Sequence, residues 1–221
     1  MSQAERHSQG PAGVALDKIL CAAEVEFAEK GFDGAGMKSL SARAGVSQSL
    51  LHYHFGSKDK LYEAVIRNRS SLINDERLQR LEAIELHAHD ALKQVVAALF
   101  IPALGPTGGG RSYARIFAGL IAGNARDQAL VKECYDPTAQ CFIDAIEAAL
   151  GGADRTVAAQ VYQFSLGVLA SVISRDGRIE RLMGEATAPL DDDTLINQLT
   201  AFVCGGARAI ACSDTTGGTE T

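Results

Sequence analysis

The segment from Gly36 to Lys60, GMKSLSARAGVSQSLLHYHFGSKDK, constrains the fold more than any other part of the sequence. It predicts two short helices on either side of a sharp turn at residues 45–47, and a further helix that begins after Ser57, a good N-cap. No acidic residue lies between Gly34 and Lys58, although the whole chain has a net charge of −6. This pattern predicts a helix-turn-helix with a locally positive surface, which is the kind of element that reads DNA.

The charge is unevenly distributed along the 221 residues. Residues 1–69 hold nine Lys and Arg against eight Asp and Glu, whereas residues 70–221 hold twelve against nineteen. An acidic protein is unsuited to coating nucleic acid non-specifically, because affinity for phosphates grows with the number of cations that reach them. One local docking face remains compatible with this balance.

Other features exclude several classes of protein. We expect neither a signal peptide nor a membrane span. The five cysteines form no C-x-x-C pair, so we expect reduced thiols and a cytoplasmic location. A redox or metal sensor is the alternative interpretation of the cysteines. No nucleophile–base or paired-carboxylate pattern indicates an enzyme, and we predict no cofactor and no metal site.

Apolar residues recur at helical spacing along the chain, with no strand-like alternation, so the sequence predicts an all-α fold. We expect an N-terminal three-helix helix-turn-helix DNA-binding domain at 14–69, with the motif at about 37–54, and a larger C-terminal helical domain at 70–212 for effector binding and dimerisation. Residues 1–13 and 213–221 are expected to be disordered. The expected helices span 14–30, 37–44, 48–55, 58 to about 69 or beyond, 75–101, 112–122, 127–134, 138–150, 155–174 and 193–211.

The helix after Ser47 has two faces when it is projected at 100° per residue. One face carries short hydrogen-bonding side chains, which suits contact with base edges, and the other carries Leu and Phe, which suits packing on the domain. The predicted outer face holds Gln48, Ser49, His52 and Tyr53. The predicted inner face holds Leu50, Leu51, His54 and Phe55, so His54 is expected to have a structural role. Lys38 and Lys58 are expected on either side of this helix, where phosphates would lie.

The stretch from Ile19 to Val65, with ILCAA, a following GF, and then AGVSQSLLHYHFGSKDKLYEAV, resembles the N-terminal domain of TetR-family transcriptional regulators. The resemblance covers about the first third of the chain and implies an all-α homodimer that binds double-stranded operator DNA. Two positions depart from the family pattern: residue 52 is usually tyrosine, and Gly36 replaces a frequent Thr or Ser cap. Carried onto this sequence, the family's DNA contacts would be Lys38, Ser47, Gln48, Ser49, His52, Tyr53, His54 and Lys58.

Residues 155–174 are apolar in two directions, so this helix has to be buried by more than one neighbour. Together with the last helix, it resembles the pair that forms the four-helix dimer interface of TetR-like proteins. Burial inside a single chain is the alternative. The expected interface residues are Val161, Phe164, Val168, Leu169, Val172, Leu195, Leu199, Phe202 and Gly206.

A pocket for a small lipophilic effector is expected among the middle helices, because the resemblance implies that ligand binding changes the separation of two DNA-binding heads. Its candidate lining residues could equally form a plain core. They are Phe100, Ile101, Leu104, Tyr113, Phe117, Leu120, Tyr135, Phe142 and Tyr162. The predicted function is a ligand-responsive repressor that binds a palindromic operator as a dimer. The alternative is a helical DNA-binding protein that acts through a protein partner without a small-molecule effector.

Overall fold

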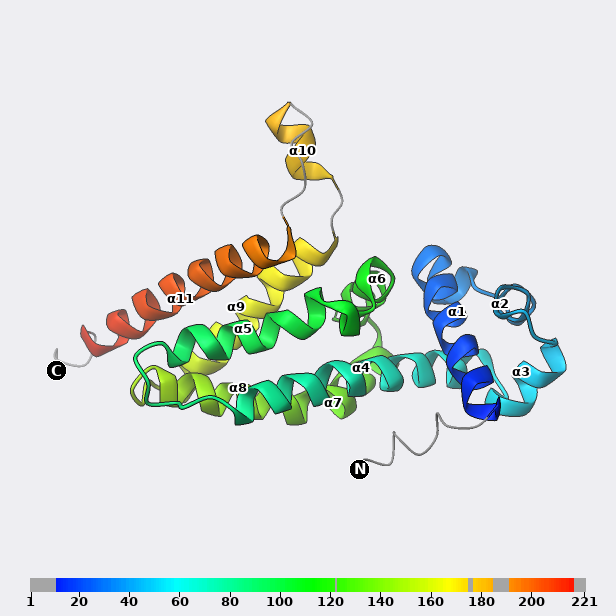
Figure 1. Ribbon diagram of the computed structural model, residues 1–221, viewed down its shortest axis with the longest axis horizontal. Coiled ribbons are helices and arrows are strands. Elements are labelled where there is room, and N and C mark those ends of the chain that lie inside the picture. Colours follow the sequence, from blue (N-terminus) through cyan, green and yellow to red (C-terminus); the bar gives the residue numbers. More distant parts are fainter. Residues whose placement is uncertain (1–10, 122, 175–176, 185–190, 217–221) are drawn as a thin grey trace.

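The computed structural model describes residues 11–121, 123–174, 177–184 and 191–216. All regular elements in these ranges are helices, which confirms the predicted all-α class. Figure 1 shows a small group of helices at one end of an elongated molecule and a larger helical bundle at the other, joined by one long helix. We call the small group the head and the bundle the body.

The head consists of α1 (Pro11–Gly34), α2 (Met37–Ala44) and α3 (Gln48–Phe55). The predicted bounds of α2 and α3 are confirmed. The expected stop after Lys30 corresponds to Gly31, which takes a left-handed φ of 69° inside α1. Gly45 ends α2 in the left-handed conformation with φ 67°, and this residue produces the turn into α3.

Helix α4 (Lys58–Glu82) begins in the head and continues into the body without a break. The expected division between residues 69 and 70 therefore falls within one helix. The Ser57 side chain accepts a hydrogen bond from the Lys60 backbone N–H at 3.2 Å, as its predicted role as a cap requires.

The body contains the rest of the chain. Its α8 and α9 lie side by side, as do α5 and α11, whereas α10 stands away from the bundle in Figure 1. The elements are α5 (Ala91–Leu104), the 3₁₀ turn η1 (Pro106–Gly108), α6 (Gly110–Ile121), α7 (Ala125–Cys134), α8 (Asp136–Ala149), α9 (Arg155–Ser174), α10 (Arg178–Met183) and α11 (Asp192–Thr216).

The prediction of a single helix at 75–101 is wrong. Its first part belongs to α4 and its last part to α5, with a non-helical connection at residues 83–90. This connection holds no Gly or Pro, so nothing local indicates it. It forms because Ile84 and Leu86 pack against the body core and turn the chain back along α4. Helix α5 then continues through Pro102 to Leu104. Pro102 removes one backbone hydrogen bond, the one to the Ala98 carbonyl, and only Ala103 and Leu104 follow it in the helix.

Two hydrophobic cores hold the molecule together. The body core is built mainly on α5, α8, α9 and α11. The head core includes side chains of α1 to α4 and also Tyr113, Ile116 and Leu120 of α6 and Leu130 of α7. Helices α6 and α7 therefore belong to the packing of the head as well as to the body.

The chain ends and the apolar helices differ in part from expectation. Residues 11–13 and 213–216, expected to be disordered, lie in α1 and α11, and the remainder of both tails lies outside the described residues. Helices α9 and α11 are each long and apolar enough to cross a membrane by length and composition alone. Because a core helix passes the same test and both helices contribute to the body core, this finding is weak evidence for a membrane span.

Candidate functional site

Helix α3 presents a polar face at the free end of the head. Its N-cap Ser47 accepts a hydrogen bond from the Leu50 backbone N–H at 3.1 Å. Leu51 is fully buried and Phe55 nearly so, and both belong to the head core. The four predicted outer residues are all exposed, namely Gln48, Ser49, His52 and Tyr53.

The inner face of α3 is narrower than predicted. Leu50 and His54 are exposed, so the structural role expected for His54 is wrong. In the helical projection these two residues lie together on one side of the predicted inner arc, whereas Leu51 and Phe55 lie together on the other side. Only that second side packs on the head core, so the buried arc is about half of the predicted one.

His52 and Tyr53 differ in how freely they can reach a ligand. The Nδ1 atom of His52 lies 3.0 Å from the Gly56 carbonyl oxygen, which can only accept, so Nδ1 carries the proton and Nε2 remains available. Tyr53 is 83% exposed, and its ring meets that of His54 edge-on at a centroid distance of 5.3 Å. A tyrosine so exposed offers a ligand both an apolar ring and a hydroxyl.

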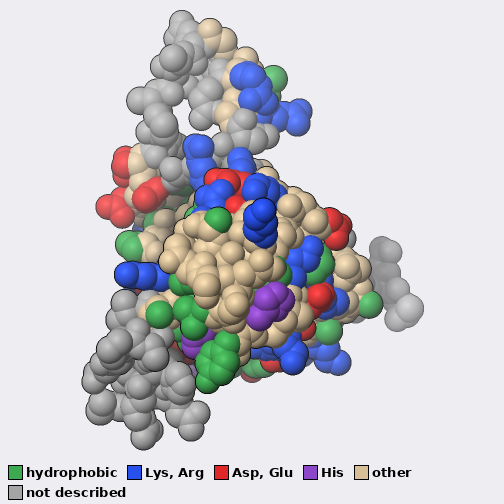
Figure 2. All heavy atoms as spheres, turned by 90° about the vertical axis from the view of Figure 1, so that its right-hand side faces the viewer, with side chains coloured by type: hydrophobic (Ala, Val, Ile, Leu, Met, Phe, Trp, Pro, Cys, Tyr) green, Lys and Arg blue, Asp and Glu red, His purple; other side chains and the backbone are tan. Residues whose placement is uncertain are grey.

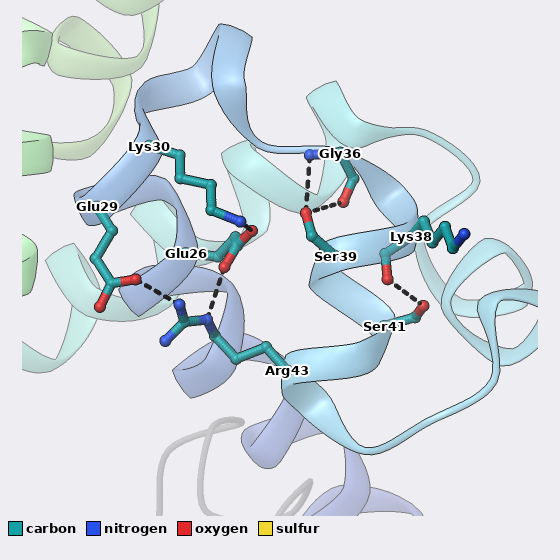
Figure 3. Close-up of polar contacts among 8 residues, drawn as sticks. All are labelled: Glu26, Glu29, Lys30, Gly36, Lys38, Ser39, Ser41 and Arg43. Atoms are coloured by element: carbon teal, nitrogen blue, oxygen red, sulfur yellow. Dashed lines mark hydrogen bonds and ion pairs between the residues drawn. The ribbon is translucent and has the colours of Figure 1, made fainter.

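A buried carboxylate fixes α2 against α1 (Figure 3). Glu26 is 1% exposed and accepts hydrogen bonds from Lys30 Nζ at 2.6 Å and Arg43 Nε at 2.7 Å. Arg43 also pairs with Glu29. Hydrogen bonds from Lys30, together with those from Ser39 and Arg43, lower the pKa of Glu26 to about 2. Arg43 is therefore a structural cation that orients α2.

The two predicted phosphate-binding lysines are placed differently. Lys38 is exposed and points away from the Glu26 cluster in Figure 3. Lys58 is half-buried; its Nζ donates to the Phe32 carbonyl at 2.9 Å and lies 4.4 Å from the centre of the Phe32 ring. Lys58 can contact a phosphate only by leaving this carbonyl, so Lys38 is the better placed of the two.

The end of the molecule that carries α2 and α3 faces the viewer in Figure 2. Its middle is mostly uncharged surface with histidine, and Lys and Arg side chains lie around it together with some Asp and Glu and hydrophobic side chains. Gly36 starts α2 without a side-chain cap, but the Ser39 hydroxyl accepts from the Gly36 N–H at 3.2 Å, which is the reciprocal bond of a capping box. This end of the head suits contact with a polyanion that is read by uncharged side chains.

The body contains a pocket of about 400 Å³ between α4, α6, α7, α8 and α9, which we call the body pocket. A second hollow of about 30 Å³ shares Arg77, Phe117 and Tyr135 with it, and we call this the inner hollow. Tyr113 and Tyr135 are joined through their hydroxyls beside the inner hollow. Burial raises the pKa of both phenols above its ordinary value, so both are neutral donors and acceptors at physiological pH.

The predicted pocket residues divide into two groups. Tyr113, Phe117, Tyr135 and Tyr162 line the body pocket or the inner hollow, and Leu104 lines a separate pocket beside α6. Phe100, Leu120 and Phe142 are completely buried in the cores and line none of these pockets, nor does Ile101. The plain-core interpretation fits Phe100, Leu120 and Phe142, whereas the half-buried Ile101 belongs to neither core.

Sequence reasoning missed Arg77, which lines both the body pocket and the inner hollow and is only 4% exposed. Its neighbours in sequence include Asp75, Glu76 and Arg80, and such a charged run is typical of a solvent-facing helix. The sequence nevertheless carries a sign that Arg77 is buried, because Arg77 follows Ile66, Ser70 and Ile73 at the spacing of one helical face.

The expected interface residues of α9 and α11 fall into buried, half-buried and exposed groups. Val161, Leu169 and Leu199 are buried within the chain, so their side chains are unavailable to a second copy. The half-buried Val168, Val172 and Leu195 pack against the body core. Phe164 at 56% exposure and Phe202 at 70% remain uncovered, and Gly206 is exposed beside them on α11.

Two sets of contacts tie the head to the helices around the body pocket. Arg126 of α7 lies 4.0 Å from the centre of the Phe32 ring and bonds Asp59 at 3.1 Å. Arg69 of α4 bonds the buried Glu24 of α1 at 2.9 Å and the Thr107 carbonyl of η1 at 2.9 Å. Burial raises the pKa of Glu24 above its ordinary value, and the bond to Arg69 opposes that rise.

Comparisons with known proteins find a matching family model for both the head and the body. Residues 19–65 match the family model described as bacterial regulatory proteins, tetR family, and residues 94–206 match the model described as tetracyclin repressor-like, C-terminal domain. The chain is 44% identical over 50 residues to the HTH-type transcriptional activator FasR of Mycolicibacterium smegmatis, which covers 23% of each chain. It is 32% identical over 85 residues to the HTH-type transcriptional repressor NicS of Pseudomonas putida, which covers 38% of this chain and 39% of that one. The matched segments thus span well under half of these curated relatives.

Solved structures share the fold over most of the chain. A putative transcriptional regulator from Pseudomonas aeruginosa superposes with a TM-score of 0.67 at 16% identity, covering 94% of this chain and 97% of that one. The fatty acid degradation regulator FadR from Bacillus halodurans gives a TM-score of 0.66 at 17% identity, covering 90% and 98%. At such low identity these likenesses establish the fold alone.

Proposed function

This chain belongs to the TetR family of transcriptional regulators, and on that basis we propose that it is a ligand-responsive repressor that binds a palindromic operator as a homodimer. DNA binding and transcriptional regulation follow from the family. The single observation that carries the proposal is α3, a short helix anchored by Leu51 and Phe55 whose polar side chains face outward at the free end of the head. In the proposal, residues 14–69 form the DNA-binding unit and 70–212 the effector-binding and dimerisation unit.

We assign roles on the DNA by chemistry. Gln48 and Ser49 have short hydrogen-bonding side chains at the start of α3, and they read base edges in the major groove. Tyr53, His52 and Lys38 reach phosphates, which fix the register of the helix on the duplex. Ser47 and the exposed His54 contribute further polar contacts, and Lys58 joins them only if its ammonium leaves the Phe32 carbonyl.

The exposed Phe164 and Phe202 support the proposed dimer. Two phenylalanines on neighbouring helices are costly to leave in water, and burying each one against a second copy would stabilise the pair. A two-fold dimer presents two α3 helices to half-sites about one helical turn, roughly 34–36 Å, apart. This geometry is why the proposed operator is palindromic.

The body pocket supports an effector role because its walls also touch the head. Helix α6 lines it with Phe117 and packs on α1. Helix α7 lines it with Val131 and reaches Phe32 through Arg126. A ligand that prefers one arrangement of α6 and α7 therefore also favours one position of the head, which is the requirement for coupling.

Operator binding is tested by footprinting the purified protein on DNA from either side of its own gene. We expect one protected palindrome. Lys38→Ala should weaken binding to all sequences and lower the slope of log affinity against log salt concentration by about 1. Gln48→Ala should change base preference. The control is Lys132→Ala, at an exposed lysine of α7 in the body, which should change neither affinity nor base preference. Failure to protect any fragment, or a uniform loss of affinity in Gln48→Ala, would contradict the roles assigned here.

Dimerisation is tested by sedimentation equilibrium of the wild type and of Phe202→Glu. We expect a dimer that dissociates in the variant, because a charge placed in an apolar interface loses its water. A monomeric wild type would overturn the proposed operator geometry.

The second candidate function, action through a protein partner, is favoured by α10, which stands away from the bundle with Leu182 69% exposed. Leu182→Ser should then abolish regulation in cells without changing operator affinity in vitro. An unchanged reporter response in that variant would remove this candidate.

A further inference from the structure

Arg77 is a buried cation that pairs with no acidic residue among those the structure describes. Its Nε donates to the Leu99 carbonyl oxygen at 3.1 Å, and no other hydrogen bond or ion pair of its side chain is found in the described parts of the chain. Arg69, which lies earlier in the same helix α4, illustrates the usual solution, because it pairs with the buried Glu24. An arginine stays charged at any physiological pH, so its burial without an anion is costly.

The position of Arg77 indicates where an anion would come from. Arg77 lies at the junction of the body pocket and the inner hollow and lines both. Tyr113, Tyr135 and Tyr162 lie close enough to affect its electrostatics. Because the Tyr113 and Tyr135 hydroxyls are bonded to each other, one hydroxyl of that pair and the Tyr162 hydroxyl can donate to a ligand. Asp136 is the acid among the residues that line the body pocket; it is exposed and makes no ion pair with Arg77 within the described ranges. The described part of the chain thus supplies no anion to Arg77, and the two pockets give an anion from outside access to it.

The rest of the body pocket is mainly apolar, with Phe117, Val131 and Leu166 among its walls. Its volume of about 400 Å³ falls within the range of small-molecule sites. The inner hollow of about 30 Å³ has room for a group only slightly larger than a water molecule. This combination matches a ligand with a long apolar part and one compact anionic end.

We propose that the body pocket binds an amphiphile with an apolar chain and a carboxylate, and that the carboxylate pairs with Arg77. The proposal rests on the effector role proposed above and names the chemical class of that effector. A carboxylate is flat and matches the planar fork of a guanidinium, so two parallel hydrogen bonds can form. The tyrosine hydroxyls then orient its oxygens, and the chain lies along α7 and α9.

The test measures binding of three probes of equal chain length, decanoate, decanol and decyl phosphate, to the full chain by titration calorimetry. We expect decanoate to bind at least about tenfold more tightly than either of the others. Decanol or decyl phosphate binding as tightly as decanoate would overturn the proposal. So would failure to bind every straight-chain carboxylate from hexanoate to hexadecanoate.

Variants locate the carboxylate. Arg77→Gln should lose about 10- to 100-fold in decanoate affinity while its weak affinity for decanol stays the same, and Arg77→Lys should fall between Arg77→Gln and the wild type. Arg80→Gln is the matched control, because Arg80 lies on the same helix and pairs with Glu76 at the surface. Unchanged decanoate affinity in a folded Arg77→Gln or Arg77→Lys, checked by circular dichroism, would refute the pairing. If Arg77→Gln does not fold, Arg77→Lys and the comparison of probes on the wild type decide.

The two proposals fail separately. Decanoate that binds through Arg77 without changing operator affinity would leave the carboxylate site intact and contradict the ligand-responsive repressor. A neutral ligand that releases the operator without needing Arg77 would support the ligand-responsive repressor and contradict the carboxylate site.

Discussion

Replacing Glu26 by glutamine should destabilise the protein in a pH-dependent way. The carboxylate is buried and holds Lys30 and Arg43, and its pKa is lowered from 4.5 to about 2. A shift of that size corresponds to about 3 kcal/mol of stability, close to the cost of about 3–5 kcal/mol for removing one partner of a buried pair. Because the folded pKa is the lower one, this contribution is fully present above pH 4.5 and is lost as the pH falls toward about 2.

Urea unfolding followed by circular dichroism measures the effect. We expect the wild type to exceed Glu26→Gln by about 3 kcal/mol at neutral pH, and this difference to shrink steadily as the pH falls below 4.5. The control is Glu29→Gln, which removes the other partner of Arg43. The Glu29 side chain is 49% exposed, so its loss should cost less than about 1 kcal/mol. A difference that does not change with pH, or equal losses in the two variants, would refute the role of Glu26.

Three further predictions concern the packing of α3 and of the body. Leu51→Ala should cost about 2–5 kcal/mol in urea unfolding because Leu51 is completely buried, whereas Leu50→Ala should cost far less. Ser47→Ala should cost about 1 kcal/mol by loss of the α3 cap, and a thermal midpoint equal to that of the wild type would remove Ser47 from that role. Gly108→Ala should be strongly destabilising, since its Cβ would lie 2.0 Å from the Ala103 carbonyl oxygen, whereas Gly119→Ala, with open space around it, should raise the free energy of unfolding by about 0.5–1 kcal/mol.

The head could be predicted closely because its boundaries are set by local chemistry. The turn after α2 needs a residue in the left-handed conformation, which Gly45 adopts without strain. Ser47 and Ser57 cap the helices that follow them, so each boundary follows from one or two adjacent residues. The faces of α3 were less certain. Angles around a helix identify the outer residues correctly, but they do not show which side of the inner arc meets the core. Leu51 and Phe55 meet it, and His54 stays exposed.

The body could be predicted only in outline, because its breaks and pockets depend on contacts between distant segments. The turn after Glu82 is produced by packing on α5 and not by a local signal. The burial of Arg77 likewise depends on α6, α8 and α9 closing around it, and the charged residues beside it in the sequence hide this. Aromatic residues at helical spacing could not be divided into pocket and core for the same reason.

The unbroken course of α4 determines how small a movement the proposed ligand response would need. Its 25 residues form a rod about 37 Å long, with one end beside the body pocket and the other beneath α3. A tilt of about 5° at the pocket end displaces the far end by roughly 3 Å, which is close to the rise of one base pair along a DNA strand. In the proposed dimer, which would hold two such rods, a rotation of about 5° would therefore put both α3 helices out of phase with the duplex.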